Sequence, residues 1–298
     1  MKIIENREMV LDRKLKIKYY KNMSRPTQPV SDKFDFPVSV IELKTPENKL
    51  SGIFASRRDD TGDIFSSFTE SYGLLKNADL LEMAEDAFKN CKMGAFQRSV
   101  NVARKGARMY ATYDFKDKIV KIPKVGDKMG FRLTVHNSYD CSCPLFLSGG
   151  GLRLVCLNGM TRGDDDVQVN KRHFTSLKLE LIESAVETAF KRFGSMTEAF
   201  GRLAEVPVKQ DEGHKILVKL QESGVISDVV REGIAQFWQT PKRLEDQPRT
   251  MYGLYNAATE YITHGLRDER FEYSIKLNER VSKIFTSRTK ESLLTLAS

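Results

Sequence analysis

The chain has 298 residues, a formal net charge of +8 and a hydrophobic content of 40%. That hydrophobic content is enough for a packed core and excludes a chain that is disordered throughout. Residues 1–23 lack the apolar stretch of a signal peptide, and no run approaches the ~20 apolar residues of a membrane span, so we expect a cytoplasmic protein.

Residues 1–30 are predicted to form a basic N-terminal arm, which contains the patch Arg13-Lys14-Leu15-Lys16-Ile17-Lys18. The alternation over Leu15–Tyr19 fits either an edge strand or a disordered arm that becomes ordered on a partner. Next, the turn Pro46-Glu47-Asn48 lies between two runs with strand composition, which predicts a hairpin of residues 36–43 and 49–56.

Apolar residues at helical spacing predict a helix over 77–91, capped by Asn77 or Asp79. The stretch from Phe96 to Thr161 is expected to form the centre of the fold. Its strands are predicted at 96–115 (one strand, or two broken at Gly106), 129–135, 145–147 and 152–157, with a basic loop over 116–128. Gly149-Gly150-Gly151 lacks the lysine and the helix start of a nucleotide-binding loop, and is expected to form a flexible turn or a bulge.

Thr175 or Ser176 is expected to cap an amphipathic helix of some 18 residues that Gly194 interrupts. Helices are then predicted at 211–222, 227–238, 251–264 and 267–286. These elements predict an α+β fold in which an antiparallel sheet packs on a long helix, followed by a helical C-terminal third. The expected division is an α+β core with a basic sheet at 31–206 and a helical region at 207–298.

Positive charge is concentrated in residues 96–132, which contain ten lysines and arginines and three aspartates, a net +7 of the whole-chain +8. A basic sheet packed on a helix is a plausible platform for a phosphate backbone. Alternation places Arg132 and Arg153 on the polar faces of their strands, so both would share one exposed surface if those strands are neighbours. Either Tyr110 or Tyr113, but not both, can face that surface and stack on a base. The predicted nucleic-acid-binding residues are Arg98, Arg104, Lys105, Arg108, Tyr110, Tyr113, Arg132, Arg153, Lys171 and Arg172.

Two groups of residues leave metal binding open. Asp164-Asp165-Asp166 offers carboxylate oxygens that a divalent cation for nuclease chemistry could use. Cys141, Cys143 and Cys156 with His136 could bind zinc, although the single residue between Cys141 and Cys143 is shorter than the usual spacing. We assign no catalytic residue, no metal and no cofactor.

Several strings resemble the domain-of-unknown-function family 932, the phage/plasmid-like proteins. They run from Arg57–Gly62, Tyr72 and Asn77 through Val125-Gly126-Asp127 and Asn137-Ser138-Tyr139-Asp140 to Arg153-Leu154-Val155-Cys156-Leu157-Asn158-Gly159-Met160 and Tyr252-Gly253-Leu254-Tyr255-Asn256-Ala257-Ala258-Thr259-Glu260-Tyr261. The resemblance covers about residues 50–270 and departs at Cys141-Ser142-Cys143, where the family commonly has glycine or small polar residues. It implies a mobile-element origin, and so a host-cell cytoplasmic location if the protein is phage-encoded, but no particular activity.

The layout of a helix, three antiparallel strands and a long helix is also similar to the core of ring-forming single-strand annealing recombinases of phages. The favoured hypothesis is therefore an oligomeric, non-catalytic recombination protein that binds single-stranded DNA, with RNA left open, and anneals complementary strands without ATP. A second hypothesis is an oligomeric phage protein that binds a host protein through its helical last third. A third is a metal-dependent nuclease that uses Asp164–Asp166.

Overall fold

The computed structural model describes residues 8–11, 15–18, 34–69, 73–123, 125–143, 145–154, 158–160, 166–167, 179–266 and 271–296. Two antiparallel sheets contain all its strands. The first has the order β1-β2-β3-β4-β5, with strands Glu8–Leu11, Leu15–Lys18, Val38–Lys44, Leu50–Arg58 and Ile64–Phe68. The predicted hairpin is β3 and β4, and the run that begins at Leu15 forms a strand.

The second sheet has the order β10-β9-β8-β7-β6, and β11 also pairs with β9. Its strands are β6 (Gln97–Ala103), β7 (Arg108–Lys121), β8 (Lys128–Ser138), β9 (Phe146–Arg153), β10 (Asn158–Met160) and β11 (Asp166–Val167). The turn η1 (Arg104–Gly106) separates β6 from β7, so the predicted break near Gly106 is confirmed.

Two central predictions were wrong. Residues up to Lys121 continue β7 past a bulge between Phe115 and Ile119, so half of the expected basic loop is strand. Gly149–Gly151 lies inside β9 in continuous register with β8. Residue 149 has to be glycine because α2 passes so close that a Cβ atom there would lie 2.7 Å from the Ala189 Cβ.

The helices are α1 (Asn77–Asn90), α2 (Leu179–Glu205), α3 (Gln210–Glu222), α4 (Asp228–Gln239), α5 (Met251–Glu260), α6 (Phe271–Ser287) and α7 (Lys290–Leu294), with the short turns η2 (Leu244–Asp246) and η3 (Tyr261–Gly265). Helix α2 has 27 residues and continues through Gly194, so the predicted interruption does not occur. Neither Asn77 nor Asp79 caps α1, whose N-cap position is Lys76. Ser227 does cap α4, because its hydroxyl accepts a hydrogen bond from the Val230 N–H.

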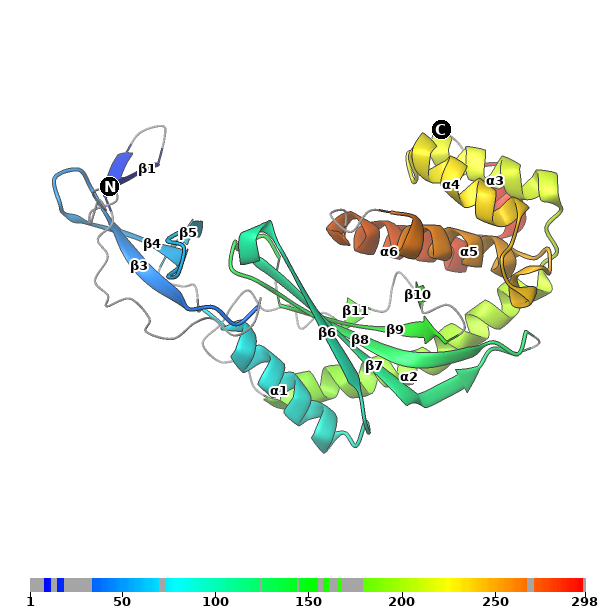
Figure 1. The fold of residues 1–298 in the computed structure, drawn as a ribbon, viewed down its shortest axis with the longest axis horizontal. Helices are drawn as coiled ribbons and strands as arrows, with labels where there is room; N and C mark the ends of the chain where they lie inside the picture. Colours follow the sequence, from blue (N-terminus) through cyan, green and yellow to red (C-terminus); the bar gives the residue numbers. More distant parts are fainter. Residues whose placement is uncertain are drawn as a thin grey trace.

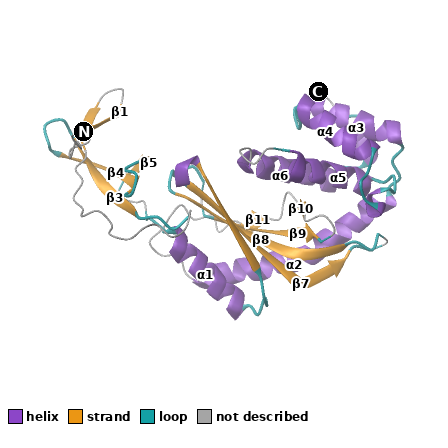
Figure 2. Cartoon of the chain, viewed as in Figure 1, coloured by secondary structure: helices purple, strands orange, loops and turns teal. Residues whose placement is uncertain are grey.

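Figure 1 shows α1 and α2 below the six-stranded sheet, α5 and α6 above it, and the five-stranded sheet at the opposite end of the molecule from α3 and α4. Figure 2 shows the same arrangement by element type, with strands at the left and centre, α1 and α2 below the central strands, and the other labelled helices at the right. The predicted α+β class and the helical C-terminal part are confirmed.

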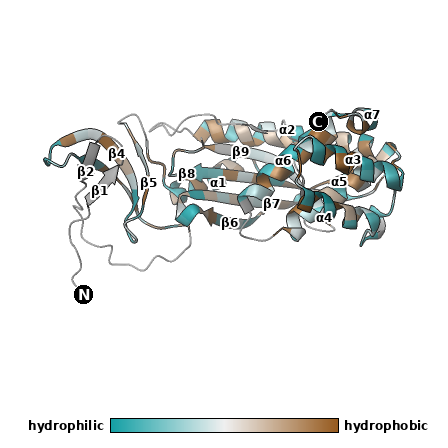
Figure 3. Ribbon diagram, turned by 90° about the horizontal axis from the view of Figure 1, so that it is seen from above, coloured by the Kyte–Doolittle hydropathy of each residue, from teal (hydrophilic) through white to brown (hydrophobic). Residues whose placement is uncertain are grey.

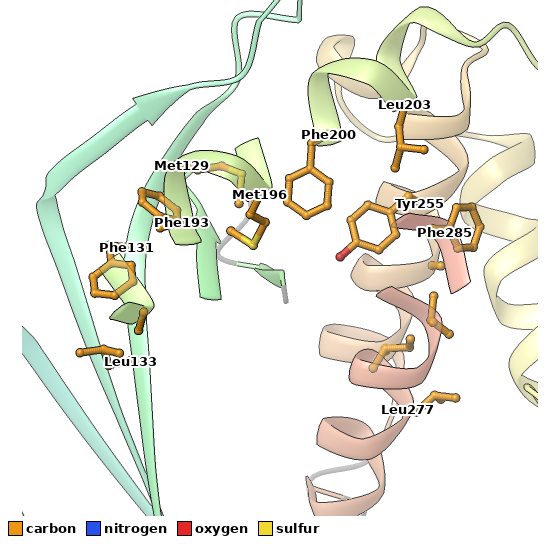
Figure 4. Packing of buried hydrophobic residues seen from close by; sticks show 14 of the residues in the cluster. Met129, Phe131, Leu133, Phe193, Met196, Phe200, Leu203, Tyr255, Leu277 and Phe285 are labelled. Carbon is orange, nitrogen blue, oxygen red and sulfur yellow. The ribbon is translucent and has the colours of Figure 1, made fainter. Parts of the chain in front are cut away.

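One hydrophobic cluster extends from the sheet to the C-terminal helices. Phe131 of β8 packs on Phe193 of α2, with their ring centroids 5.3 Å apart. Further along α2, the Phe200 ring stacks on Tyr255 of α5 at 5.2 Å, and Tyr255 contacts Phe285 of α6. Figure 4 shows this path from the strands through α2 to α5 and α6. Helix α2 therefore joins the sheet to the helical part of the molecule.

Candidate nucleic-acid interface

The six-stranded sheet has one apolar and one polar face. Side chains such as Tyr113 and Leu133 are fully buried on the side of α1 and α2. Their neighbours along each strand point to the other side, which we call the polar face. The polar face carries Gln97, Ser99 and Asn101 of β6, Thr112 and Asp114 of β7, and Arg132 and Thr134 of β8. The three β6 residues are exposed, so this part of the sheet is open to solvent.

Arg108 and Tyr110 lie at one end of the polar face, where the N-terminus of α6 covers them. The Arg108 guanidinium donates to Asp140 at 2.9 Å and to Glu272 at 2.8 Å, and its side chain is only 10% exposed. The Tyr110 hydroxyl also donates to Glu272, at 2.8 Å, and its ring stacks on His136 with centroids 4.3 Å apart. Both side chains thus help to attach α6 to the sheet.

Arg104 and Lys105 lie beside this attachment in the η1 turn and are much more exposed. The Arg104 side chain is 59% exposed, and its Nε lies 3.3 Å from a Glu272 oxygen. The Lys105 side chain is 79% exposed, and its ammonium lies 3.9 Å from Asp63. Such solvated pairs contribute little to stability and can exchange partners, so both cations remain accessible to a polyanion.

Arg132 and Arg98 lie on opposite faces of the sheet. Arg132 is on the polar face and forms a two-point contact with Asp114, with the Nη2 atom at 2.8 Å from Oδ2. Arg98 points toward α1, where its Nη1 atom donates to Glu85 at 2.7 Å. Both cations are therefore partly neutralised by a carboxylate of the same chain.

The expectation that Arg153 shares an exposed surface with Arg132 is wrong. Strands β8 and β9 are neighbours, but Arg153 pairs opposite Met129, whereas Arg132 pairs opposite Gly150. This register turns Arg153 toward the core, where its side chain is 0% exposed and contacts Asp127 at 2.8 Å and Asp246 at 2.7 Å.

The two tyrosines lie on opposite faces, as their spacing predicts. Tyr113 is fully buried between Phe88 and Phe96, and its hydroxyl donates to Glu85 at 3.1 Å. Burial raises the pKa of both the Tyr110 and the Tyr113 phenol above its ordinary value. Neither ring is free to stack on a base in this structure.

Three further lysines of the basic stretch lie at the other end of the sheet, in the β7–β8 hairpin. Lys121 pairs directly opposite Lys128 on the polar face, and both side chains are exposed. Lys118 lies on the side of α2, with its ammonium 5.5 Å from the centre of the Phe190 ring. Within the described part of the chain, none of these three lysines has a carboxylate within ion-pair distance.

Ile119 adds an exposed apolar side chain between the lysines, with 48% of its surface accessible. The sequence showed this cluster of lysines, but the assignment of residues 116–128 to a loop hid the pairing that places Lys121 and Lys128 side by side.

The predicted metal sites lie largely outside the described residues. Asp164, Asp165 and Cys156 are not described, and neither are the candidate residues Lys171 and Arg172. Cys141 is exposed and Cys143 is half-buried in the loop that follows β8. Among the residues that the structure does describe, no three His, Cys, Asp or Glu side chains form a group that could hold a metal ion.

Described residues from several of the strings behind the family resemblance meet in two polar networks, one at each end of the sheet. In the first, Arg153 lies between Asp127 and Asp246, the Tyr252 hydroxyl donates to Asp127 at 3.0 Å, and the Asn256 amide donates to Asp246 at 3.0 Å. This network joins the β7–β8 hairpin and the end of β9 to α5.

The second network joins the two sheets and α1. The Asn137 amide donates to the Asn77 side chain at 2.8 Å, and the Asn77 backbone N–H donates to the Tyr139 hydroxyl at 2.8 Å. The Tyr139 carbonyl in turn accepts a bond of 2.7 Å from Ser56 of β4. Both networks are buried, so these residues make structural contacts between elements rather than an exposed binding site.

These features define an α+β protein with an open polar sheet face and a lysine-bearing hairpin. The family model described as "Domain of unknown function (DUF932)" matches residues 64–293, and the chain belongs to this family. No curated protein matches the chain. No solved structure matches it either, and the resemblance to ring-forming annealing recombinases stays a prediction. In the described part of the chain, no helix has the length and apolar character needed to cross a membrane.

Proposed function

We propose that the protein binds single-stranded nucleic acid on the polar face of β6–β8 and promotes ATP-independent annealing of complementary strands in the cytoplasm. One observation carries this proposal, namely the direct opposition of Lys121 and Lys128. Like charges at opposite positions of a strand pair destabilise a sheet, and a bound polyanion would remove that penalty.

The rest of the polar face offers groups that suit a sugar-phosphate backbone. Ser99, Thr112 and Thr134 supply hydroxyl groups, and Asn101 supplies an amide. Arg104 and Lys105 add two exposed cations at the other end of the sheet. Contacts of these kinds hold a strand without reading its sequence, which is what annealing of arbitrary complements requires.

The binding test is a fluorescence-anisotropy titration of a labelled single-stranded oligonucleotide at several salt concentrations. Neutralisation of four phosphates, one each by Lys121, Lys128, Arg104 and Lys105, predicts a log–log salt slope of about −3. The double variant Lys121→Gln/Lys128→Gln should bind more weakly and reduce the magnitude of that slope by about 1.4.

The control is Lys215→Gln/Lys219→Gln on α3, which removes the same number of positive charges from another element and should leave the slope unchanged. A slope near zero, or equal losses in both double variants, would exclude the hairpin site. Parallel titrations with RNA and duplex DNA establish which type of nucleic acid the protein prefers.

Annealing itself is tested with two complementary strands that carry a fluorophore and a quencher, in the absence of nucleotide. The wild-type protein should accelerate quenching, and the hairpin double variant should lose most of that acceleration. Tight binding without acceleration would exclude annealing and leave a single-strand-binding protein.

A further inference from the structure

The first turn of α6 lies over the η1 end of the polar face, and Figure 3 shows α6 over the strands of this sheet when the molecule is viewed from above. One carboxylate of this turn, that of Glu272, accepts hydrogen bonds from three donors. Its Oε1 atom accepts from Arg108 and from the Tyr110 hydroxyl, both at 2.8 Å, and its Oε2 atom lies 3.3 Å from the Arg104 Nε. The three donors therefore converge on one group that has a single negative charge and two oxygens.

A phosphodiester matches the Glu272 carboxylate in the features that these donors recognise. Each group carries one negative charge, and the two non-bridging oxygens of the phosphodiester correspond to the two carboxylate oxygens. Arginine guanidinium groups bind both kinds of group through paired N–H donors. Asp140 already neutralises one of the two arginines, because it accepts from the Arg108 Nε at 2.9 Å. Exchanging Glu272 for one phosphodiester would therefore leave the net charge of this cluster unchanged.

The side chains that follow Phe271 at the start of α6 do not belong to the hydrophobic core. Among residues 272–276 no side chain is buried, and the first buried one after them is that of Leu277. The second half of α6 is held by α5, where the Tyr255 and Ser282 hydroxyl groups form a hydrogen bond of 2.7 Å. Lifting residues 272–276 from the sheet would therefore break polar contacts and leave the packing from Leu277 onward in place.

We propose that Arg104, Arg108 and Tyr110 form a subsite for one phosphodiester of a single nucleic-acid strand. In the free protein Glu272 occupies this subsite, and a strand that binds displaces the first turn of α6. The subsite depends on the proposed function, since its ligand is the strand that lies on the polar face. The Glu272 contact is autoinhibitory, because the apparent affinity falls with the fraction of molecules in which the subsite is open.

The affinity test compares variants in the anisotropy titration of a labelled single-stranded oligonucleotide. Glu272→Gln should bind about tenfold more tightly than the wild type at low salt and increase the magnitude of the salt slope by about 0.7, since one more phosphate is neutralised. The control Glu198→Gln removes one negative charge from an exposed position of α2 and should leave both quantities unchanged. If the wild type binds with a slope of about −3 but Glu272→Gln binds no more tightly than the control, the subsite is excluded and the proposed function stands.

Two double variants with the wild-type net charge show whether Arg108 is responsible for the gain. Glu272→Gln/Arg108→Gln should return to about the wild-type affinity, whereas Glu272→Gln/Lys215→Gln, which removes a positive charge from α3 instead, should keep the gain. Circular dichroism establishes that both are folded. Equal affinities in the two double variants would overturn the subsite. A salt slope near zero for both the wild type and Glu272→Gln would exclude the proposed function and the subsite together.

Amide exchange of the wild-type protein tests the displacement without any substitution. A saturating single-stranded oligonucleotide should make the amides of residues 275–279 exchange about threefold faster, because a helix end that has lost its contacts with the sheet opens more often. The amides of the β7–β8 hairpin should exchange more slowly in the same experiment, since the strand covers them. Slower or unchanged exchange at the start of α6, together with protection of the hairpin, would mean that Glu272 stays on the sheet and would overturn the proposal.

Discussion

The Arg153 guanidinium lies between the carboxylates of Asp127 and Asp246, and the side chains of Arg153 and Asp127 are both 0% exposed. A buried charge of this kind is tolerated only when its partners remain in place. Tyr252 completes the arrangement from α5 with a hydrogen bond to Asp127. Burial raises the pKa of the Tyr252 phenol well above its ordinary value, so this hydroxyl stays protonated and donates.

Removing one partner from this network should be costly. Asp127→Asn leaves Arg153 with one carboxylate and should lower the free energy of unfolding by about 3–5 kcal/mol. Tyr252→Phe removes one hydrogen bond and should cost about 1–2 kcal/mol. Urea unfolding followed by the fluorescence of Trp238, the single tryptophan, measures both. An Asp127→Asn variant that is no less stable than Tyr252→Phe would contradict this account of the network.

At the scale of elements, the contact between α2 and β9 depends on the absence of a side chain at Gly149. A Cβ atom there would lie 2.7 Å from the Ala189 Cβ and 3.3 Å from its Cα, and neither atom can move without moving the helix. At Gly151 the nearest atoms are the terminal methyl groups of Met129 and Met196, which are flexible. The two glycines therefore differ in how much an added methyl group disturbs the packing.

Gly149→Ala should therefore destabilise the protein by about 1–3 kcal/mol, and Gly151→Ala should cost less because the methionines can change rotamer. Thermal unfolding of the two variants under one set of conditions gives the comparison. If Gly151→Ala lowers the stability more than Gly149→Ala does, the close approach of α2 to Gly149 is not the contact that limits the packing here.

The sequence was most informative where a pattern is local. The hairpin of β3 and β4, the amphipathic helix α1 and the alternation in β8 were all predicted, because each depends on neighbours in the chain. The nature of the Gly149–Gly151 run depends on Ala189, forty residues away, and was not visible. The direction of Arg153 was missed for a similar reason, since it depends on which residue of β8 lies opposite.

The candidate site shows the same limit. The sequence identified the basic stretch, but it could not show that carboxylates from distant segments, such as Glu272 and Asp63, lie beside its arginines and lysines at the η1 end. Lys121 and Lys128 lack such partners among the described residues, which moves the centre of the proposed interface from the arginines to these two lysines.

At the scale of the whole molecule, Glu272 holds the C-terminal helices over the polar face of the sheet. Partial burial tends to raise the pKa of this carboxyl, but hydrogen bonds from Tyr110 and Arg108 outweigh that effect and hold the pKa below its ordinary value of 4.5. Because the folded-state pKa is depressed, the stabilisation is present above the unfolded-state pKa and is lost as the pH falls through the folded-state pKa.

The wild-type protein should therefore exceed Glu272→Gln in free energy of unfolding by about 1–2 kcal/mol at pH 7, since hydrogen bonds to an ionised group are lost in the variant. The difference should shrink as the pH is lowered from 5 toward 3. Chemical denaturation at each pH measures it, and amide exchange shows whether α6 is the region released. A difference that stays constant over this range would mean that the ionisation of Glu272 does not control the docking of α6.

The opposed ammonium groups of Lys121 and Lys128 should also affect which small anions bind to the protein. Two neighbouring positive charges concentrate small anions from the medium, and multivalent anions more strongly than chloride. An ion that is retained by the folded chain and released on unfolding stabilises the native state by mass action. Phosphate or sulfate buffers should therefore occupy the hairpin, stabilise the fold there and compete with the proposed nucleic acid.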